Sequence, residues 1–394
     1  MGTPVRTNES DIRRLTPLTP RAKATRGQTR VNNLRLALQI IFDKAPTSRA
    51  EVARESNLTP ATASDLVDEL LAMDLVEQVG FGVSAGGKPP VLIAPKSTGR
   101  QIVALDISSP LFRGAIVDLS GNVVEVKSIE GATRDKGVAA TVALVEQLLD
   151  STTVPVLGVG VGAPGVVNPE LGVVTSANLH WSAMELRAAI SAVTDAPVHL
   201  INDAQGAALS EYTEMQGDTG SLVLVRVGFG IGAGYILDGH LFRGDNPAIG
   251  EIGHVRLDGD GPQCACGNTG CLESKASMSA VLRTLGRTEP LSRAVVEEVA
   301  RDPEALGAIG TAATELGRVL SGIVAALAVS EVKIWGEATE LGEEYRRAVE
   351  DEVRNRVLSI GAEQLTVNYA IAGDDAVIRG AAALVLSSEL GVTW

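Results

Sequence analysis

Residues 250–274, GEIGHVRLDGDGPQCACGNTGCLES, hold the densest set of metal-ligating side chains in the sequence. His254 stands near the start of this stretch, and the three cysteines of the chain follow as Cys264, Cys266 and Cys271. One imidazole and three thiolates suit tetrahedral Zn(II), with zinc–sulfur distances of about 2.3 Å. Such close spacing favours metal ligation over a disulfide framework, and three unrelated buried thiols are the alternative. Because four protein ligands leave no open coordination position, we expect one structural Zn(II) per chain.

The same stretch resembles the signature of the ROK family, which comprises repressors, uncharacterised frames and sugar kinases. That signature is Glu-x-x-His followed by Cys-x-Cys-Gly-x-x-Gly-Cys-x-Glu, and the resemblance runs from about residue 100 to the end of the sequence. It implies a two-lobed α/β fold of the actin/hexokinase (ribonuclease H-like) sugar-kinase type. It also implies that Glu251, His254 and Glu273 bind sugar hydroxyls, so that one segment shapes both the zinc site and a wall of the pocket.

Further segments resemble sugar-binding segments of the family. GVGAPGVVN at 160–168 contains Gly165, SANLHW contains Asn178, and Asn202-Asp203 follows the strand-like VHLI. The resemblance implies that these residues contact sugar, and that Asp203 corresponds to the base that deprotonates the sugar hydroxyl in the kinases. Carboxylates, amides and an imidazole suit a polyol because each hydroxyl donates and accepts at once.

The loops that hold nucleotide phosphates in the kinases are altered in this sequence. The Gly-Gly-Thr turn is replaced by Ser108-Ser109-Pro110, and Pro110 has no N–H to donate. The Gly-Thr-Gly turn has become Gly228-Phe229-Gly230, and a Gly-Gly pair has become Gly336-Glu337, which adds negative charge. Phosphoryl transfer depends on donors and cations around the transferring group, so we expect neither ATP binding nor catalysis.

A kinase base can serve a sensor as an ordinary hydrogen-bond acceptor, so the retention of Asp203 fits a protein without catalysis. We therefore predict a sugar-responsive DNA-binding transcriptional regulator, a repressor by family branch, whose kinase-like domain binds a small sugar or sugar phosphate. The main alternative is an ATP-dependent, glucokinase-like sugar kinase with an accessory helix-turn-helix domain. A transport protein as effector is a further alternative, and neither the sugar nor repression as opposed to activation follows from the sequence.

Charge divides the chain into two unequal parts. The net charge is −14, yet residues 1–100 carry 14 Lys and Arg against 10 Asp and Glu. Residues 1–28 are basic and rich in Pro and Thr, a composition that predicts a disordered arm. The basic part therefore favours contact with DNA, while the acidic remainder does not.

Residues 29–96 have the pattern of a winged helix-turn-helix domain. VNNLRLALQIIF at 31–42 predicts a first helix, Thr47 or Ser48 caps a second, and Thr59 caps a third that opens with Pro60. Strand-like residues 75–79 and 91–93 flank a Gly-rich wing. The third helix would enter the major groove by its N-terminal end, as in other helix-turn-helix domains. The alternative is a three-helix unit for dimerisation or protein binding. The predicted DNA contacts are Thr59, Ala61, Thr62, Ser64 and Lys88.

Residues 97–394 alternate short apolar strands with helices, which predicts two α/β lobes and a cleft at their strand ends. The sequence is 45% hydrophobic but only 3% aromatic, so Val, Ala, Leu and Ile must build the core. No apolar run approaches the ~20 residues of a membrane helix, and no secretion signal is evident, so we expect a cytoplasmic protein. The expected partners are operator DNA and the sugar, bound by a homodimer or a dimer of dimers.

Overall fold

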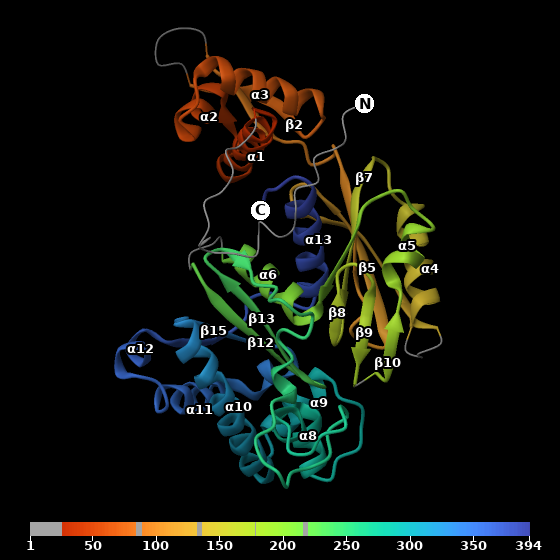
Figure 1. Ribbon diagram of the computed structural model, residues 1–394, viewed down its shortest axis with the longest axis vertical. Coiled ribbons are helices and arrows are strands. Elements are labelled where there is room, and N and C mark those ends of the chain that lie inside the picture. The colour runs from red at the N-terminus through yellow and green to blue at the C-terminus, as the bar shows by residue number, and fades with distance from the viewer. Residues whose placement is uncertain (1–25, 84–88, 132–135, 178, 216–219) are drawn as a thin grey trace.

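The computed structural model describes residues 26–83, 89–131, 136–177, 179–215 and 220–394 (Figure 1). A helical N-terminal unit lies at the top of the view, above two α/β lobes (Figure 1). The predicted arm lies outside the described residues except at its end, where helix α1 already begins at Arg26. Among the described residues, no helix combines the length and apolarity that a lipid bilayer requires.

The second and third helices of the N-terminal unit start where their caps predict, whereas the first begins at Arg26, ahead of the predicted 31–42. The Ser48 hydroxyl accepts a hydrogen bond from the Glu51 amide, and the Thr59 hydroxyl accepts one from the Thr62 amide, with Pro60 in the first turn. The apolar face of the third helix is buried, as its spacing predicts. The helices are α1 (Arg26–Lys44), α2 (Arg49–Ser56) and α3 (Pro60–Ala72).

A small antiparallel sheet completes this unit, with the strand order β1-β3-β2. Thr47 on β1 lies opposite Ile93 on β3, so the turn before the second helix is tied to the wing. The tip of the wing, residues 84–88, lies outside the described residues. The strands are β1 (Thr47–Ser48), β2 (Val76–Phe81) and β3 (Val91–Pro95).

The first lobe is built on a five-stranded sheet with the order β11-β7-β4-β5-β6. The strands β4, β5 and β6 form an antiparallel meander, and β7 and β11 are added parallel to β4. The elements are β4 (Gln101–Asp106), β5 (Leu111–Asp118), β6 (Val123–Glu130), α4 (Gly137–Leu149), β7 (Val156–Ala163), α5 (Leu186–Ser191) and β11 (Val198–Asn202).

The second lobe repeats this topology with the order β14-β13-β12-β15-β16. In both lobes the strands follow a meander of three with two parallel strands on the other side, so the predicted pair of α/β lobes is confirmed. The strands are β12 (Leu222–Val227), β13 (Ile231–Leu237), β14 (His240–Leu241), β15 (Glu331–Trp335) and β16 (Thr366–Tyr369). The helices are α7 (Leu272–Ala276), α8 (Met278–Thr284), α9 (Arg293–Ala300), α10 (Leu306–Leu327), α11 (Gly342–Arg354) and α12 (Ser359–Gln364), with short 3-10 turns η2 (Ile252–His254), η3 (Pro303–Ala305) and η4 (Glu337–Leu341).

Two helices, α6 (Asp203–Glu214) and α13 (Ala376–Glu389), lie between the sheets of the two lobes (Figure 1). They cross at two glycines so closely that a Cβ atom on Gly380 would lie 1.8 Å from the Gly206 carbonyl oxygen. Their side chains share one core with the N-terminal unit, while each lobe has a further core of its own. The N-terminal unit is packed onto the two lobes in part through the residues that follow α13, where Gln39 of α1 exchanges hydrogen bonds with Thr393.

One region differs from the sequence prediction. A helix expected near 183–194 is shorter, because β10 (Trp181–Met184) occupies the start of that range. This strand joins β8 (Val166–Asn168) and β9 (Gly172–Ser176) in a three-stranded sheet beside the cleft. The sheet was not predicted, since its strands are short and are interrupted by turn-forming Gly, Pro and Asn.

Candidate zinc site and sugar-binding cleft

The four predicted metal ligands meet in the second lobe. One ligand atom from each of His254, Cys264, Cys266 and Cys271 lies within 4.8 Å of every other. The sulfur of Cys264 lies 3.5 Å from His254 Nδ1, and the sulfurs of Cys266 and Cys271 are 3.8 Å apart. Four ligands at about 2.3 Å from a tetrahedral ion would be separated from one another by about 3.8 Å. The geometry is therefore compatible with a structural metal such as zinc.

The local fold explains how so short a segment gathers four ligands. The Cys264 amide donates to Asn268 O at 2.8 Å, and the Gly267 amide donates back to Cys264 O at 3.0 Å, which closes a tight turn. Gly267 and Gly270 both have positive φ, at 93° and 71°. A Cβ atom on Gly270 would also lie 2.3 Å from Asp258 O, so only glycine fits there.

The charge balance of the cluster also fits a cation. Burial raises the pKa of the Cys264 thiol and raises that of Cys271 to about 12. Thiols in such surroundings stay protonated unless a positive ion offsets the cost of ionisation. Against the effect of burial, hydrogen bonds lower the pKa of the Cys266 thiol. A divalent ion would offset the cost of ionising all three thiols, so the donor set is compatible with a bound metal.

The two family carboxylates stand beside the metal ligands. Glu251 Oε2 lies 3.6 Å from His254 Nε2, and Glu273 Oε2 accepts a hydrogen bond from the Ile231 amide at 3.0 Å. Burial, together with the negative charge of Glu273, raises the pKa of Glu251 to about 7. The loop that gathers the metal ligands thus also fixes two hydrogen-bonding carboxyl groups at one place.

A hollow of about 580 Å³ opens in front of Glu251, between the two lobes, and Gly165, Asn202, Asp203 and Glu273 lie outside its lining. Glu251, His254 and Cys266 line it from the second lobe. Its opposite side is formed by the β8–β10 sheet and the turn before Trp181, through Val166, Thr175, Ser176, Ala177, His180 and Trp181. Val166 lies in the segment 160–168 and most of the other residues lie in 176–181, the two segments expected from the sequence to contact sugar, whereas Thr175 was not expected. The predicted sugar contact Asn178 lies outside the described residues, although Ala177 and His180 line the hollow.

Asn202 and Asp203 stand at the junction of β11 and α6. The Asn202 side chain caps α6, accepting from the amides of Ala204 and Gln205, and donates to Gly165 O at 3.0 Å. Asn202 therefore already holds the Gly165 loop and the helix in place. The buried Asp203 carboxylate forms a short ion pair with Arg226, a side chain that was not predicted from the sequence.

Two amides of the altered phosphate loops are engaged in hydrogen bonds within the protein. The amide of Ser108 donates to Asp106 Oδ1 at 2.8 Å, and the amide of Gly228 donates to Gly230 O at 3.0 Å. The Glu337 carboxylate lies so close to Gly228 that a Cβ atom there would be 2.0 Å from Glu337 Oε2. A carboxylate thus occupies space beside a turn that faces phosphate in a kinase.

The predicted DNA contacts lie at the start of α3. Thr59 and Ala61 are exposed, Thr62 and Ser64 are half-buried, and Lys88 lies outside the described residues. The Thr59 and Thr62 hydroxyls are hydrogen-bonded to each other at 2.8 Å. Arg49, at the start of α2, donates to the Ser64 hydroxyl and pairs with Asp68. Arg49 was missed as a candidate, although a cation in the first turn of the preceding helix was visible in the sequence.

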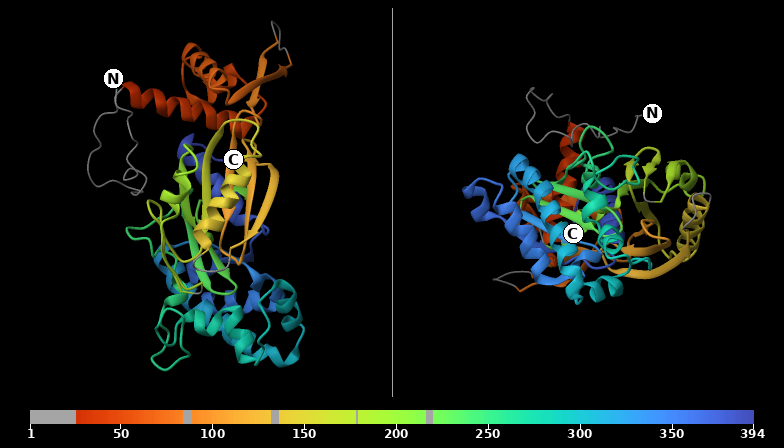
Figure 2. Two further views of the ribbon diagram at one scale, coloured as in Figure 1. Left: turned by 90° about the vertical axis from the view of Figure 1, so that its right-hand side faces the viewer. Right: turned by 90° about the horizontal axis from the view of Figure 1, so that it is seen from below.

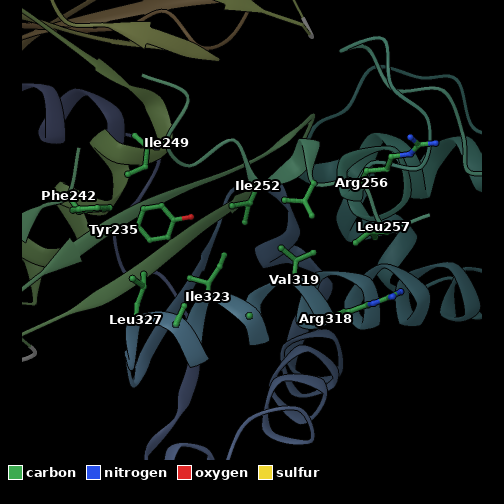
Figure 3. Close-up of a pocket in the computed structure, with 13 residues that line it drawn as sticks. Tyr235, Phe242, Ile249, Ile252, Arg256, Leu257, Arg318, Val319, Ile323 and Leu327 are labelled. Carbon is green, nitrogen blue, oxygen red and sulfur yellow. The ribbon is translucent and has the colours of Figure 1, made fainter. Parts of the chain in front are cut away.

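A second hollow, of about 660 Å³, lies on the second lobe between β13 and α10 (Figure 3). Tyr235, Phe242 and Ile323 are among its mainly apolar lining residues, and Arg256 and Arg318 lie at one end (Figure 3). Carboxylate and amide side chains are missing from its described lining, so it offers few partners for sugar hydroxyls. The cleft between the lobes is therefore the better candidate for a polyol.

Comparison with known proteins agrees with these features. The model of the ROK family matches residues 102–388. A xylose repressor of Caldicellulosiruptor bescii is 28% identical over 91% of this chain and 96% of its own length. The crystal structure of a ROK family transcriptional regulator, a homologue of the E. coli MLC protein, matches with a TM-score of 0.78 and 25% identity over 92% of this chain and 98% of its own. A ROK family glucokinase from Streptomyces griseus, solved with glucose and AMPPNP, matches with a TM-score of 0.62 and 26% identity over 72% of this chain and 98% of its own.

Proposed function

The chain belongs to the ROK family, and from this premise we propose that it is a sugar-responsive DNA-binding transcriptional regulator, a repressor of genes for carbohydrate uptake or metabolism. One observation carries the proposal. The similarity to a xylose repressor covers 91% of the chain, whereas the similarity to a glucokinase covers 72%. The longer match takes in sequence outside the kinase-like lobes, so the chain resembles repressors in its organisation as well as in its fold.

The proposed effector is a small sugar or sugar phosphate bound in the cleft between the lobes. Its hydroxyls would contact Glu251 and His254, with Glu273 behind them, from the second lobe. Asp203 and the Gly165 loop would contribute from the first lobe, with Asn202 holding that loop and Asn178 adding an amide. Donors and acceptors on both lobes mean that a bound sugar favours a closed cleft.

The proposed metal is one Zn(II) held by His254, Cys264, Cys266 and Cys271. Its role here is structural, since the four ligands complete a tetrahedral site. By fixing the loop that carries Glu251 and precedes Glu273, the ligands position these two carboxyl groups, which together form the carboxyl wall of the proposed sugar site.

The proposed DNA contacts are made by the start of α3, through Thr59, Ala61, Thr62 and Ser64, and by Lys88 on the wing. A homodimer, or a dimer of dimers, would present two such helices to a two-fold operator. Closure of the cleft would then change the relative placement of the two N-terminal units. A coupling of roughly 5- to 150-fold in operator affinity lies within the range of ordinary allosteric proteins.

Two measurements, made one after the other, test this proposal. A thermal-shift screen against aldoses, amino sugars and their phosphates should find a ligand, because at about 100 times its Kd a ligand stabilises by about 2.7 kcal/mol. Operator affinity is then measured with and without that ligand at one fixed salt concentration, since salt alone changes DNA affinity strongly. A sugar that binds tightly and leaves operator affinity unchanged would refute the regulatory proposal.

The second candidate function is an ATP-dependent sugar kinase, favoured by the retention of Asp203 and by the similarity to a glucokinase. The engaged donors at Ser108 and Gly228 and the nearby Glu337 carboxylate argue against it. ATP turnover with a hexose panel at a rate of about 1 per second or more would establish it. We expect no product above the uncatalysed background.

A further inference from the structure

Arg226 is a charged side chain that lies next to the cleft and is included in neither the metal cluster nor the proposed sugar contacts. It lies near the end of β12, opposite Gly232 of β13 and Trp335 of β15. Side chains two apart on a strand share a face, and Leu222 and Leu224 belong to the core that includes α6. Arg226 therefore points toward α6 and the junction of the lobes, away from the core of the second lobe.

Two contacts hold the guanidinium in place. Its Nη1 forms a short ion pair with Asp203 Oδ2, and its carbon lies 5.7 Å from the centroid of the Trp335 ring. Only 20% of the Arg226 side chain and 6% of the Asp203 side chain are exposed. Among the described residues, the Arg226 side chain donates a hydrogen bond only to Asp203, so the remaining N–H groups of its guanidinium are available to a ligand.

This ion pair adjoins the carboxyl wall of the cleft. Gly232, which faces Arg226 across the sheet, comes within van der Waals reach of both neighbouring segments. A Cβ atom on Gly232 would lie 3.5 Å from Ala204 Cβ and 3.9 Å from Gly250 O. Asp203 precedes the first of these residues and Glu251 follows the second, so the ion pair and the wall are separated by a single glycine.

We infer that Arg226 is a sugar-binding and specificity-determining residue, which together with Asp203 recognises one free hydroxyl of the effector. The inference rests on the proposed sugar-binding function. A hydroxyl group needs one acceptor for its proton and can accept a hydrogen bond in return. The Asp203 carboxylate can accept the hydrogen bond that the hydroxyl proton donates, and the Arg226 guanidinium can donate a hydrogen bond to the hydroxyl oxygen. The pair therefore complements both the proton and the oxygen of the hydroxyl. A sugar that is esterified or deoxygenated at that carbon has no hydroxyl proton to donate to Asp203. The site therefore selects sugars whose hydroxyl at that position is free.

The same pair distinguishes this site from a kinase site. A catalytic base must take the hydroxyl proton during transfer, whereas a carboxylate that is already paired with a guanidinium favours its ionised form. Hydrogen bonds to charged partners are the stronger ones, so the pair gives affinity for the unreacted sugar. Arg226 thus strengthens the binding of the sugar, whereas a kinase needs a carboxylate that can take up the hydroxyl proton.

The test combines one variant with matched ligands, in the full-length, metal-loaded protein. The affinity of the best aldose from the screen, and of its monodeoxy analogues, is measured by calorimetry for the wild type and for Arg226→Met. We expect Arg226→Met to weaken the parent sugar by roughly 10- to 100-fold, since it removes a hydrogen bond from a charged group. One deoxy analogue should lose a similar or larger factor in the wild type and a clearly smaller factor in the variant, because both changes remove the contact to Arg226 and only the contact to Asp203 remains to be lost.

Controls separate this role from a structural one. Arg301→Met, at an exposed arginine in the second lobe, should leave all affinities unchanged. If Arg226→Met is unstable because Asp203 is left unpaired, the double variant Asp203→Asn/Arg226→Met removes both charges, and Arg226→Lys should restore part of the discrimination. Equal losses for every analogue, or an unchanged affinity for the parent sugar, would overturn the inference while sugar binding itself stands. A wild type that binds no sugar would overturn both the inference and the proposed function.

Discussion

Single side chains separate a sugar sensor from a sugar kinase in this fold. Glu337 places a carboxylate against Gly228, and Pro110 removes an N–H from the first turn. Each change would oppose a phosphate group, by charge repulsion or by the loss of a donor, while the side chains proposed to bind sugar hydroxyls are retained. The phosphate side of the cleft therefore carries the changes that oppose catalysis.

The metal cluster provides the first prediction at this scale. Cys266→Ser removes one thiolate, and the metal content should fall below one per chain as measured by elemental analysis. Because Glu251 and Glu273 lie on the segment that the metal holds, sugar affinity should fall by roughly tenfold or more, as for changes that weaken metal sites generally. Calorimetry with the sugar found in the screen measures this loss.

The control for this variant is Asp260→Asn, an exposed position in the same segment. It should keep both the metal and the sugar affinity. A metal-free Cys266→Ser protein that binds sugar as tightly as the wild type would show that Glu251 and Glu273 keep their positions without the metal.

Residue types and spacing were enough to predict that His254, Cys264, Cys266 and Cys271 come together, because one imidazole and three thiols within one short segment are typical of a zinc site. Arg226 was not predicted, although LVLVRV contains one charge in an otherwise apolar strand, and a buried charge on a strand needs a partner. That partner, Asp203, precedes it by more than twenty residues, and only the packing of α6 on the second sheet brings the two together.

Helices with strong local signals formed as expected. Thr59 and Pro60 predict the start of α3, and its apolar spacing predicts the buried face. The β8–β10 sheet carries no such signal, since its short strands are stabilised by pairing with one another and by contact with the lobe. The strands of this side of the cleft were therefore invisible to local reasoning, although the segments 160–168 and 176–181 were expected to contact sugar.

The cap of α3 gives a prediction for the proposed recognition helix. Thr59→Ala removes the hydrogen bond to the Thr62 amide, and the free energy of unfolding should fall by about 1 kcal/mol. Operator affinity should fall further than stability alone requires, because Thr59 is exposed at the proposed DNA surface. Chemical denaturation and DNA titration measure the two effects, and Thr59→Ser, which keeps the hydroxyl, is the matched control. An equal loss of operator affinity in both variants would argue against a role for the cap.

The crossing of α6 and α13 gives a second prediction for elements. A methyl group on Gly380 would collide with the backbone of Gly206, so Gly380→Ala should destabilise the protein by at least about 1–3 kcal/mol. Gly310→Ala is the matched control, because that glycine lies in α10 with no atom within 4 Å of the added Cβ. It should stabilise the protein by about 0.5–1 kcal/mol, since alanine is the better helix former. Thermal unfolding of both variants decides the matter, and a neutral Gly380→Ala would show that the helices can separate.

Over the whole molecule, a series of contacts joins the cleft to the N-terminal unit, which lies at one end of the molecule (Figure 2). Asp203 is the first residue of α6, α6 crosses α13 at the two glycines, and Glu211 of α6 accepts hydrogen bonds from the amides that lead into α13. The residues after α13 then reach α1. Gln39 of α1 exchanges two hydrogen bonds with the backbone of Thr393, at 2.9 and 3.0 Å.

The contact between Gln39 and Thr393 gives a prediction about how sugar binding affects operator affinity. Trp394 anchors the same segment on the first lobe, where its indole N–H donates to Leu119 O at 2.8 Å, so a shift of α13 would be passed to α1 through the Gln39 pair. Gln39→Ala should keep the sugar affinity and the metal, but the effect of sugar on operator affinity should shrink to less than about threefold, from the roughly 5- to 150-fold range of allosteric coupling. Gln364→Ala, an exposed position on α12, should keep the full response. Measuring operator affinity with and without sugar for both variants gives the answer. A full sugar response in Gln39→Ala would show that the Gln39 contact does not transmit the effect. The coupling would then be assigned to a second connection between the N-terminal unit and the first lobe, where Arg100 donates to Met73 O at 3.0 Å and the Leu119 amide donates to Ser97 O.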